Sequence, residues 1–451
     1  MDYIIYFAIT IGILVFVHEF GHFAAAKLSG MRADVFAIGF GKRLFGWNKI
    51  SGFSFGELPK DFDGEGHTDY RLCLLPLGGY VKIAGMIDES FDADFAEKEP
   101  QPYEFRSKSV WKKVFVITAG VFMNLMLALL IFWGKNFFQG EQIITTTKIG
   151  YVQPHSIIDS LGFRPGDKIL SINNRPVENW GDIRSDIFVN TLGENVKVNL
   201  ERNGKISEIT IPRKVIPDNE SKKLFLIPAG FQPEIGGVLK GTPAEKAGMQ
   251  KGDLFLSIAD TTIYSAQQTI RIISGHKNES ISFKMLRGKD TLQLAATPGA
   301  DGKIGIEITQ NSKAPIEYKS YGFFASFYYG WNDIVKMTDL TFSMLGKVFS
   351  GQIAFGKAFG GPIKIAEFAT QSANSGLASF LLFLGLLSLS LAILNIMPFP
   401  VLDGGHLVII IIEAVMKREI PVKVKYAIQQ TGFVLLLLLM AFIIYNDLIS
   451  L

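Results

Sequence analysis

The chain has one cysteine, Cys73, so no disulfide can form within it and cysteine usage says nothing about the redox compartment. It has little net charge, +3 over 451 residues, and no long basic run. We therefore expect no nucleic-acid partner. Apolar residues are abundant: 48% of the chain is hydrophobic and the mean hydropathy is +0.26, beside 19% charged residues. This mixture predicts membrane spans combined with water-facing domains.

Four segments are long and apolar enough to cross a bilayer, which takes about 20 residues. They are residues 3–26, 114–133, 377–397 and 427–449. The first begins with an acidic residue and ends without a small-residue cleavage site, so we expect a retained span rather than a signal peptide. The expected fold class is a multi-pass α-helical membrane protein with four transmembrane helices in a lipid bilayer.

Basic residues cluster beside one end of each span, which predicts that these ends are cytoplasmic. Both termini and the long stretch 134–375 then lie outside the cytoplasm. The clusters are Lys27 and Arg32; Lys108, Lys112 and Lys113; and Lys417, Arg418, Lys423 and Lys425.

The stretch 321–354 is rich in aromatic residues but is interrupted by charges, including Asp333 and Lys336. Charges at mid-bilayer depth are costly. We therefore expect an amphipathic helix in the membrane interface rather than a fifth span.

The external stretch contains an internal repeat, because residues 149–173 align with 235–259 at a constant offset. Each copy continues into two short segments of alternating apolar and polar residues joined by a glycine turn, a pattern that predicts a β-hairpin. The repeat resembles the PDZ family and predicts two tandem PDZ-like α+β domains. A strand edge in such a domain can bind an extended peptide. Neither copy has the G-L-G-F loop that captures a C-terminus, and a role as steric cover is the alternative.

The first span contains His18-Glu19-Phe-Gly-His22. On a helix the two histidines share one face, so their imidazoles can converge on one metal ion, and Glu19 points about 100° away toward a water at that metal. Ionisable residues inside a span are functional by default. The alternative is that the three residues hydrogen-bond between packed helices.

Zinc held by two imidazoles needs a third protein ligand and keeps one position open. The string N-I-M-P-F-P-V-L-D-G-G-H-L at 395–407 offers Asp403 at the end of the third span, and His406 competes for the role. Asp403 could instead cap the helix that begins at Gly404.

Together, the H-E-F-G-H string, the tandem PDZ-like domains and N-x-M-P-x-P-V-L-D-G-G resemble the site-2 protease family of intramembrane zinc metalloproteases, and closely its bacterial sigma-E-regulating type. The likeness covers nearly the whole chain. It implies that His18, His22 and Asp403 bind zinc and that Glu19 is the general base. It also implies an inner-membrane enzyme with its active site near the cytoplasmic side and its PDZ-like domains in the periplasm, where they could filter substrates by size. The implied substrates are single-span membrane proteins already cut outside, such as an anti-sigma factor or a signal-peptide remnant.

The resemblance further implies a membrane-associated β region near the active site. An unwound substrate helix needs replacement hydrogen-bond partners, which a strand edge can supply. Gly39 and Gly41 around Phe40 would allow close backbone approach, Asn395 could hydrogen-bond the substrate, and Pro398 and Pro400 would keep their segment out of helix. Val121 stands where the family more usually has proline, and no proposed ligand depends on it.

The expected order is a helix with H-E-x-x-H at 1–30, the β region at 31–111, a helix at 112–134, PDZ-like domains at 140–220 and 225–312, the interfacial region at 318–372, a helix with L-D-G-G at 376–408 and a last helix at 426–450. Two other classes are a membrane-anchored periplasmic PDZ adaptor and a metal or proton transporter. An adaptor would not need Glu19, and a transporter would need more ionisable residues in the other spans.

Overall fold

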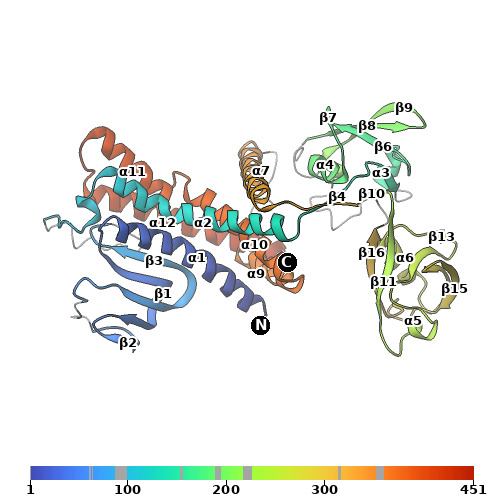
Figure 1. The fold of residues 1–451 in the computed structure, drawn as a ribbon, viewed down its shortest axis with the longest axis horizontal. Coiled ribbons are helices and arrows are strands. Elements are labelled where there is room, and N and C mark those ends of the chain that lie inside the picture. Colours follow the sequence, from blue (N-terminus) through green and yellow to red (C-terminus); the bar gives the residue numbers. More distant parts are fainter. Residues whose placement is uncertain are drawn as a thin grey trace. The chain divides into compact units, whose positions relative to one another are not determined.

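The computed structural model describes residues 2–59, 62, 64–86, 99–152, 156–187, 194–216, 226–312, 316–351 and 360–450. The chain divides into two compact units. The helical unit comprises Met1–Gln139 and Ser320–Leu451, and the strand-rich unit comprises Gly140–Lys319. In Figure 1 the first consists mainly of long helices beside a sheet, and the second of strands with short helices.

Four helices of the helical unit are long and apolar enough to cross a membrane: α1 (Asp2–Leu28), α2 (Val110–Phe138), α10 (Leu377–Asn395) and α12 (Val422–Ser450). They coincide with the four expected spans, so this part of the prediction is confirmed. Helices α2 and α12 begin several residues earlier than expected and include flanking lysines. Helical hydrogen bonding continues past the apolar run, and lysine side chains can keep their charge in water while their stems pack on apolar surface.

The spans pack closely through small residues, as is common between membrane helices. A Cβ added to Gly21 of α1 would lie 2.5 Å from the Ala119 carbonyl oxygen of α2. On the other side of α2, Ser388 of α10 donates its hydroxyl to the Asn124 carbonyl oxygen at 2.7 Å. An apolar cluster fills the space between these helices and α7: Ala128, Leu129, Phe132, Ile334, Leu389 and Ile393.

Three further helices complete the helical unit: α7 (Phe323–Phe349), α9 (Pro362–Asn374) and α11 (Asp403–Met416). Helix α7 packs along the end of α2, where Asn136 donates to Asp333 at 2.9 Å. It is not among the candidate spans found in the described residues. Its interfacial position stays a prediction. Asp447 of α12 accepts a hydrogen bond from the Gly361 backbone N–H at 3.1 Å and so joins α12 to the start of α9.

The predicted β region is an antiparallel sheet of β1 (Ala33–Asn48), β2 (Gly52–Phe55) and β3 (Asp69–Ile83), in the order β2-β1-β3. Phe36 pairs with both Tyr70 and Val81, so the first half of β1 lies between two segments of β3. The outer segment, residues 79–83, pairs with β1 and with no other strand in the described part of the chain. This segment, called the outer edge below, packs on α1 and α2 through Val81 and Ile83.

Gly39 and Gly41 have φ of 88° and 82°, a left-handed conformation that favours glycine. The pairing of β1 with β3 loses its register between Ile38 and Arg43. The G-F-G string is therefore an irregularity inside β1 rather than a separate turn.

The strand-rich unit contains two successive sets of similar elements, each with its own apolar cluster. Strands β4 (Glu141–Ile144) and β17 (Ile316–Lys319), at its two ends, pair with each other. The first set is β5 (Ile149–Tyr151), α3 (Ile157–Ser160), β6 (Lys168–Ile172), β7 (Arg175–Pro176), α4 (Trp180–Ser185), β8 (Val196–Arg202), β9 (Lys205–Ile211) and β10 (Ile227–Pro228). The second is β11 (Phe231–Val238), α5 (Pro243–Lys246), β12 (Leu254–Ile258), β13 (Thr261–Thr262), α6 (Ala266–Gly275), β14 (Ile281–Arg287), β15 (Asp290–Ala296) and β16 (Ile306–Ser312).

The aligned Gly-Asp pairs form the same contact in both sets. Asp167 is paired with Arg202 at 2.6 Å, and Asp253 with Arg287 at 2.7 Å. These hydrogen bonds raise the pKa of both arginines. Each arginine also donates to the carbonyl of the aligned upstream glycine. The repeat read from the sequence thus corresponds to one structural arrangement made twice. Assignment of the two sets to the PDZ type stays a prediction.

Candidate metal centre

His18 and His22 lie one turn apart on α1, and their Nε2 atoms are 3.1 Å apart. The i, i+4 spacing on a helix brings the two rings together. His22 Nδ1 lies 2.9 Å from the Val116 carbonyl oxygen of α2. Because a carbonyl oxygen can only accept, the Nδ1 atom carries the proton. The neutral ring then presents a lone pair on Nε2 toward His18.

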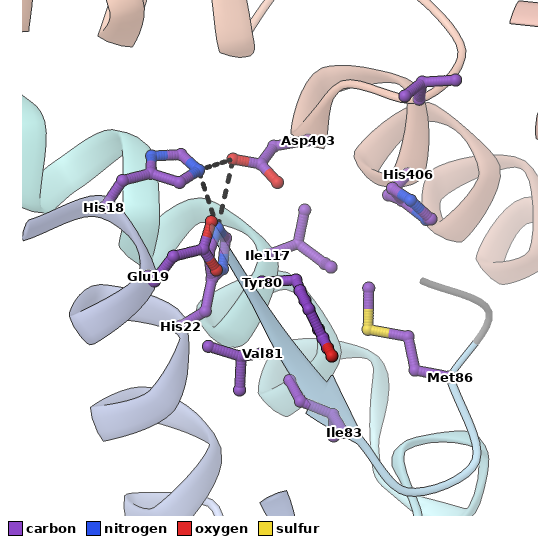
Figure 2. A pocket seen from close by; sticks show the side chains of 11 residues that line it. His18, Glu19, His22, Tyr80, Val81, Ile83, Met86, Ile117, Asp403 and His406 are labelled. Atoms are coloured by element: carbon purple, nitrogen blue, oxygen red, sulfur yellow. Dashed lines mark hydrogen bonds and ion pairs between the residues drawn. The ribbon is translucent and has the colours of Figure 1, made fainter. Parts of the chain in front are cut away.

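Asp403 comes to the same point from the other end of the chain. Its Oδ2 atom lies 3.3 Å from His18 Nε2 and 3.4 Å from His22 Nε2, as Figure 2 shows. Helix α11 begins at Asp403, its N-cap is Leu402, and no side chain caps it. The carboxylate therefore faces the imidazoles and does not cap its own helix. Asp403 Oδ2 is buried, and among the described residues no group besides the two imidazoles lies where it could donate a hydrogen bond to this oxygen.

The three facing atoms fit a metal ion. Ligands about 2.0–2.1 Å from a tetrahedral zinc lie about 3.3 Å from one another. The separations of the two Nε2 atoms and Oδ2 are 3.1, 3.3 and 3.4 Å. Lone pairs that converge at this distance repel one another unless a proton or a cation lies between them. Among the residues that the structure describes, these three form the group suited to holding a metal.

Glycines set the position of Asp403. A Cβ on Gly404 would lie 2.2 Å from the Met397 carbonyl oxygen, and one on Gly405 would lie 2.3 Å from the Phe399 carbonyl oxygen. The loop 396–402 therefore folds directly onto the start of α11. Val401 in this loop has φ of 80°, which is strained for a β-branched residue and often marks a functional site.

A cavity of about 70 Å³ adjoins the three residues. Glu19 reaches it from α1, and Tyr80, Val81 and Ile83 line it from β3. Glu19 is buried, and a Cβ on Gly79 would lie 3.2 Å from its Cγ. The outer edge of the sheet therefore passes directly beside the Glu19 side chain.

The residues predicted to bind substrate divide into two groups. The Asn395 amide nitrogen lies 3.4 Å from His18 Nε2, and Pro398 and Pro400 lie in the loop before Asp403. The Gly39-Phe40-Gly41 string does not line the cavity. Phe40 instead stacks on Tyr80, with ring centroids 6.1 Å apart.

The family resemblance implies that the string L-L-P-L-G-G-Y-V-K-I-A-G-M at 74–86 lies in the β region near the active site, but it does not single out Tyr80, Val81 and Ile83 as cavity residues. They belong to the string G-G-Y-V-K-I at 78–83, whose paired glycines were the available signal. Only the pairing of β3 with β1 shows that this segment, and not G-F-G, lies at the outer edge beside Glu19.

His406 lies across the cavity from His18 in Figure 2 and is not part of the three-residue group. Its Nε2 atom contacts the Gln429 amide nitrogen of α12 at 3.1 Å. A second cavity, of about 200 Å³, shares His406 and Met86 with the first. Charged residues line it: Arg106, Lys113, Glu413, Glu419 and Lys425. A second cavity with several charged side chains in its lining thus adjoins the candidate metal centre.

The chain has four helices long and apolar enough to cross a membrane, and one of them contains the H-E-x-x-H string. An aspartate that follows another of these helices meets the two histidines. These features define a class of membrane-embedded metallopeptidases. The model of peptidase family M50 matches residues 6–439, and the chain belongs to that family.

Three relatives are similar over nearly their whole lengths. A putative zinc metalloprotease of Vibrio cholerae is 32% identical, covering 98% of this chain and 97% of the relative. The regulator of sigma E protease of Haemophilus influenzae is 32% identical, covering 99% and 98%. Protease RseP of Yersinia pestis is 31% identical, covering 98% and 97%.

Proposed function

We propose that the chain is a zinc metalloprotease that hydrolyses peptide bonds within the membrane segments of single-span proteins, with His18, His22 and Asp403 as zinc ligands. One observation carries this assignment: two imidazole nitrogens and a buried carboxylate oxygen converge within 3.4 Å, and no other described group donates to that oxygen. Membership of peptidase family M50 supports the activity, and the name of the Vibrio relative supports the metal.

Glu19 is the general base of the reaction. When bound, zinc supplies a Lewis acid that activates water and polarises the scissile carbonyl. Glu19 takes a proton from the attacking water and returns it to the leaving amine. Its burial beside the outer edge of β3 keeps the carboxylate next to the backbone to be cut. Asn395, close to His18, hydrogen-bonds the substrate backbone, and Pro398 and Pro400 hold the loop that carries Asp403.

The substrate binds as an extended strand along the outer edge. A membrane helix hides its peptide bonds in its own hydrogen bonds, so its backbone must exchange them for others before cleavage. Residues 79–83 are extended, pair with β1 and pass beside Glu19, so a substrate strand aligned with them would lie next to the general base. Residues Gly39, Phe40 and Gly41 support the edge through the contact of Phe40 with Tyr80.

We expect disulfide cross-linking to show a strand-like substrate. In a Glu19→Gln background, Tyr80→Cys should cross-link to cysteines at alternate positions of a single-span substrate, because strand residues i and i+2 share a face. Cys73 is buried and can be replaced with alanine as a check. Ser51→Cys, in the exposed turn between β1 and β2, is the control and should give no pattern. Cross-linking that recurs every three to four substrate positions would instead mean that the substrate binds as a helix.

The proposed cellular role is regulation of a sigma E response, in line with the names of the Haemophilus and Yersinia relatives. The proposed substrates are a membrane-bound anti-sigma factor and signal-peptide remnants. The basic ends of the spans support an active site near the cytoplasmic side of the inner membrane, with both termini and the strand-rich unit in the periplasm. There the two PDZ-like domains act as a size filter or bind peptide. The second, charged cavity lets water reach the metal centre.

Metal analysis of the purified full chain tests the ligand assignment. The wild type should hold about one zinc, and His22→Ala and Asp403→Ala should each lose it, since two remaining protein ligands are too few for a stable site. His406→Ala is the matched control on the same helix and should keep its zinc. Zinc that persists in Asp403→Ala but not in His406→Ala would reassign the third ligand, and a zinc-free wild type would overturn the proposal.

A further inference from the structure

We propose that Asn124 of α2 is a positioning residue for the metal centre. Its amide oxygen accepts the Nδ1 proton of His18 and so keeps His18 Nε2 free to bind the metal. This inference rests on the zinc site proposed above, and it assigns a role to a residue that touches neither metal nor substrate.

Asn124 is fully buried, and its side-chain amide lies 3.3 Å from His18 Nδ1. Its backbone carbonyl oxygen accepts a hydrogen bond from the Ser388 hydroxyl of α10 at 2.7 Å. The side chain is therefore held against the imidazole by helix packing that does not involve the metal.

The Asn124 amide nitrogen, Nδ2, is the atom placed 3.3 Å from His18 Nδ1, and the two amide orientations put the ring proton on different nitrogens. With the amide nitrogen toward Nδ1, that ring atom must accept, so the ring proton moves to Nε2, where it would point at the metal. In that orientation Asn124 Oδ1 is buried and receives no hydrogen bond from the residues that the structure describes. Rotating the amide by 180° exchanges oxygen and nitrogen at nearly the same positions. The oxygen then accepts from Nδ1–H, and Nε2 keeps its lone pair.

His22 provides the parallel case in this structure. Its Nδ1 donates to the Val116 carbonyl oxygen, so the same helix α2 supplies the acceptor. Residues 116 and 124 are eight apart, which is about two turns, and so lie on one face of α2. Metal-ligating histidines commonly donate their second nitrogen to an acceptor that fixes the tautomer and ring orientation. Helix α2 provides this acceptor for both histidines.

The test compares two substitutions of similar size. Asn124→Leu removes the acceptor, and the zinc dissociation constant, measured by chelator competition on the full chain in detergent, should rise about 10- to 100-fold. Asn124→Asp keeps an atom that can only accept, so its zinc affinity should equal or exceed that of the wild type. Gly134→Ala is the control, because it lies on the same helix where an added Cβ meets nothing within 4 Å among the described residues, and its zinc affinity should stay within about twofold of the wild type.

A merely structural role would weaken zinc binding in the Leu and Asp variants alike, and that result would overturn the inference. Unchanged affinity in Asn124→Leu would overturn it as well. These outcomes differ from failure of the proposed metal site. If that site is wrong, the wild type will bind no zinc or Asp403→Ala will keep it. If only the positioning role is wrong, the zinc affinities of the two Asn124 variants alone will depart from expectation.

Discussion

We expect the Glu19→Gln variant of the full chain to keep about one zinc and to cleave a single-span reporter at least about 100-fold more slowly than the wild type. Glutamine has nearly the same shape as glutamate, so the walls of the cavity should be unchanged. It cannot accept a proton from the attacking water or return one to the leaving amine. Zinc content and the cleavage rate in detergent are the two measurements, and together they separate proton transfer from metal binding.

Glu317→Gln makes the same chemical change on β17 of the strand-rich unit, at an exposed position, and should leave the cleavage rate unchanged. Undiminished cleavage in Glu19→Gln would remove this residue from the mechanism. Loss of zinc in the same variant would show instead that the carboxylate supports the metal.

The second large effect is expected from Gly120→Ala. A Cβ at this position of α2 would lie 2.3 Å from His22 Nε2 and 2.7 Å from His18 Cε1. Both imidazoles must then move away from residue 120, and a displacement of about 1 Å at a catalytic centre can cost about 100-fold in rate. We expect zinc affinity and cleavage to fall together, as measured by chelator competition and by reporter cleavage.

Gly134→Ala is the matched control, since it lies on the same helix and a Cβ there would have no neighbour within 4 Å. It should bind zinc and cleave like the wild type. Normal zinc binding in Gly120→Ala would mean that α1 and α2 can separate at this point without disturbing the ligands.

The sequence predicted the features whose signals are local. An apolar run of 20 residues defines a span by its own composition, and two histidines four residues apart on one helix must share a face. For this reason the four spans and the meeting of His18 with His22 were predictable. The choice of Asp403 over His406 was not settled by spacing, because both residues lie near the same turn and both can bind zinc. It depended on the family resemblance.

Features that depend on tertiary contacts could not be predicted. Gly120 and Asn124 matter because α2 packs on α1, a contact between residues about 100 positions apart. In the sequence no proposed ligand depends on Val121, although its neighbour Gly120 lies against both histidines and Asn124 lies beside His18. The outer edge of β3 depends likewise on how β1 bends at Gly39 and Gly41. No periodicity in a single segment encodes these relations.

The last span also contributes to the geometry of the metal centre. A Cβ on Gly432 of α12 would lie 2.4 Å from Pro400 Cβ, in the loop that leads into Asp403. Helix α12 thus packs directly against that loop, although it supplies none of the three atoms proposed to bind the metal. A random-mutagenesis screen for inactive variants should therefore recover bulky replacements of Gly432. Measuring the metal content of these variants would distinguish damage to the metal centre from damage to membrane insertion.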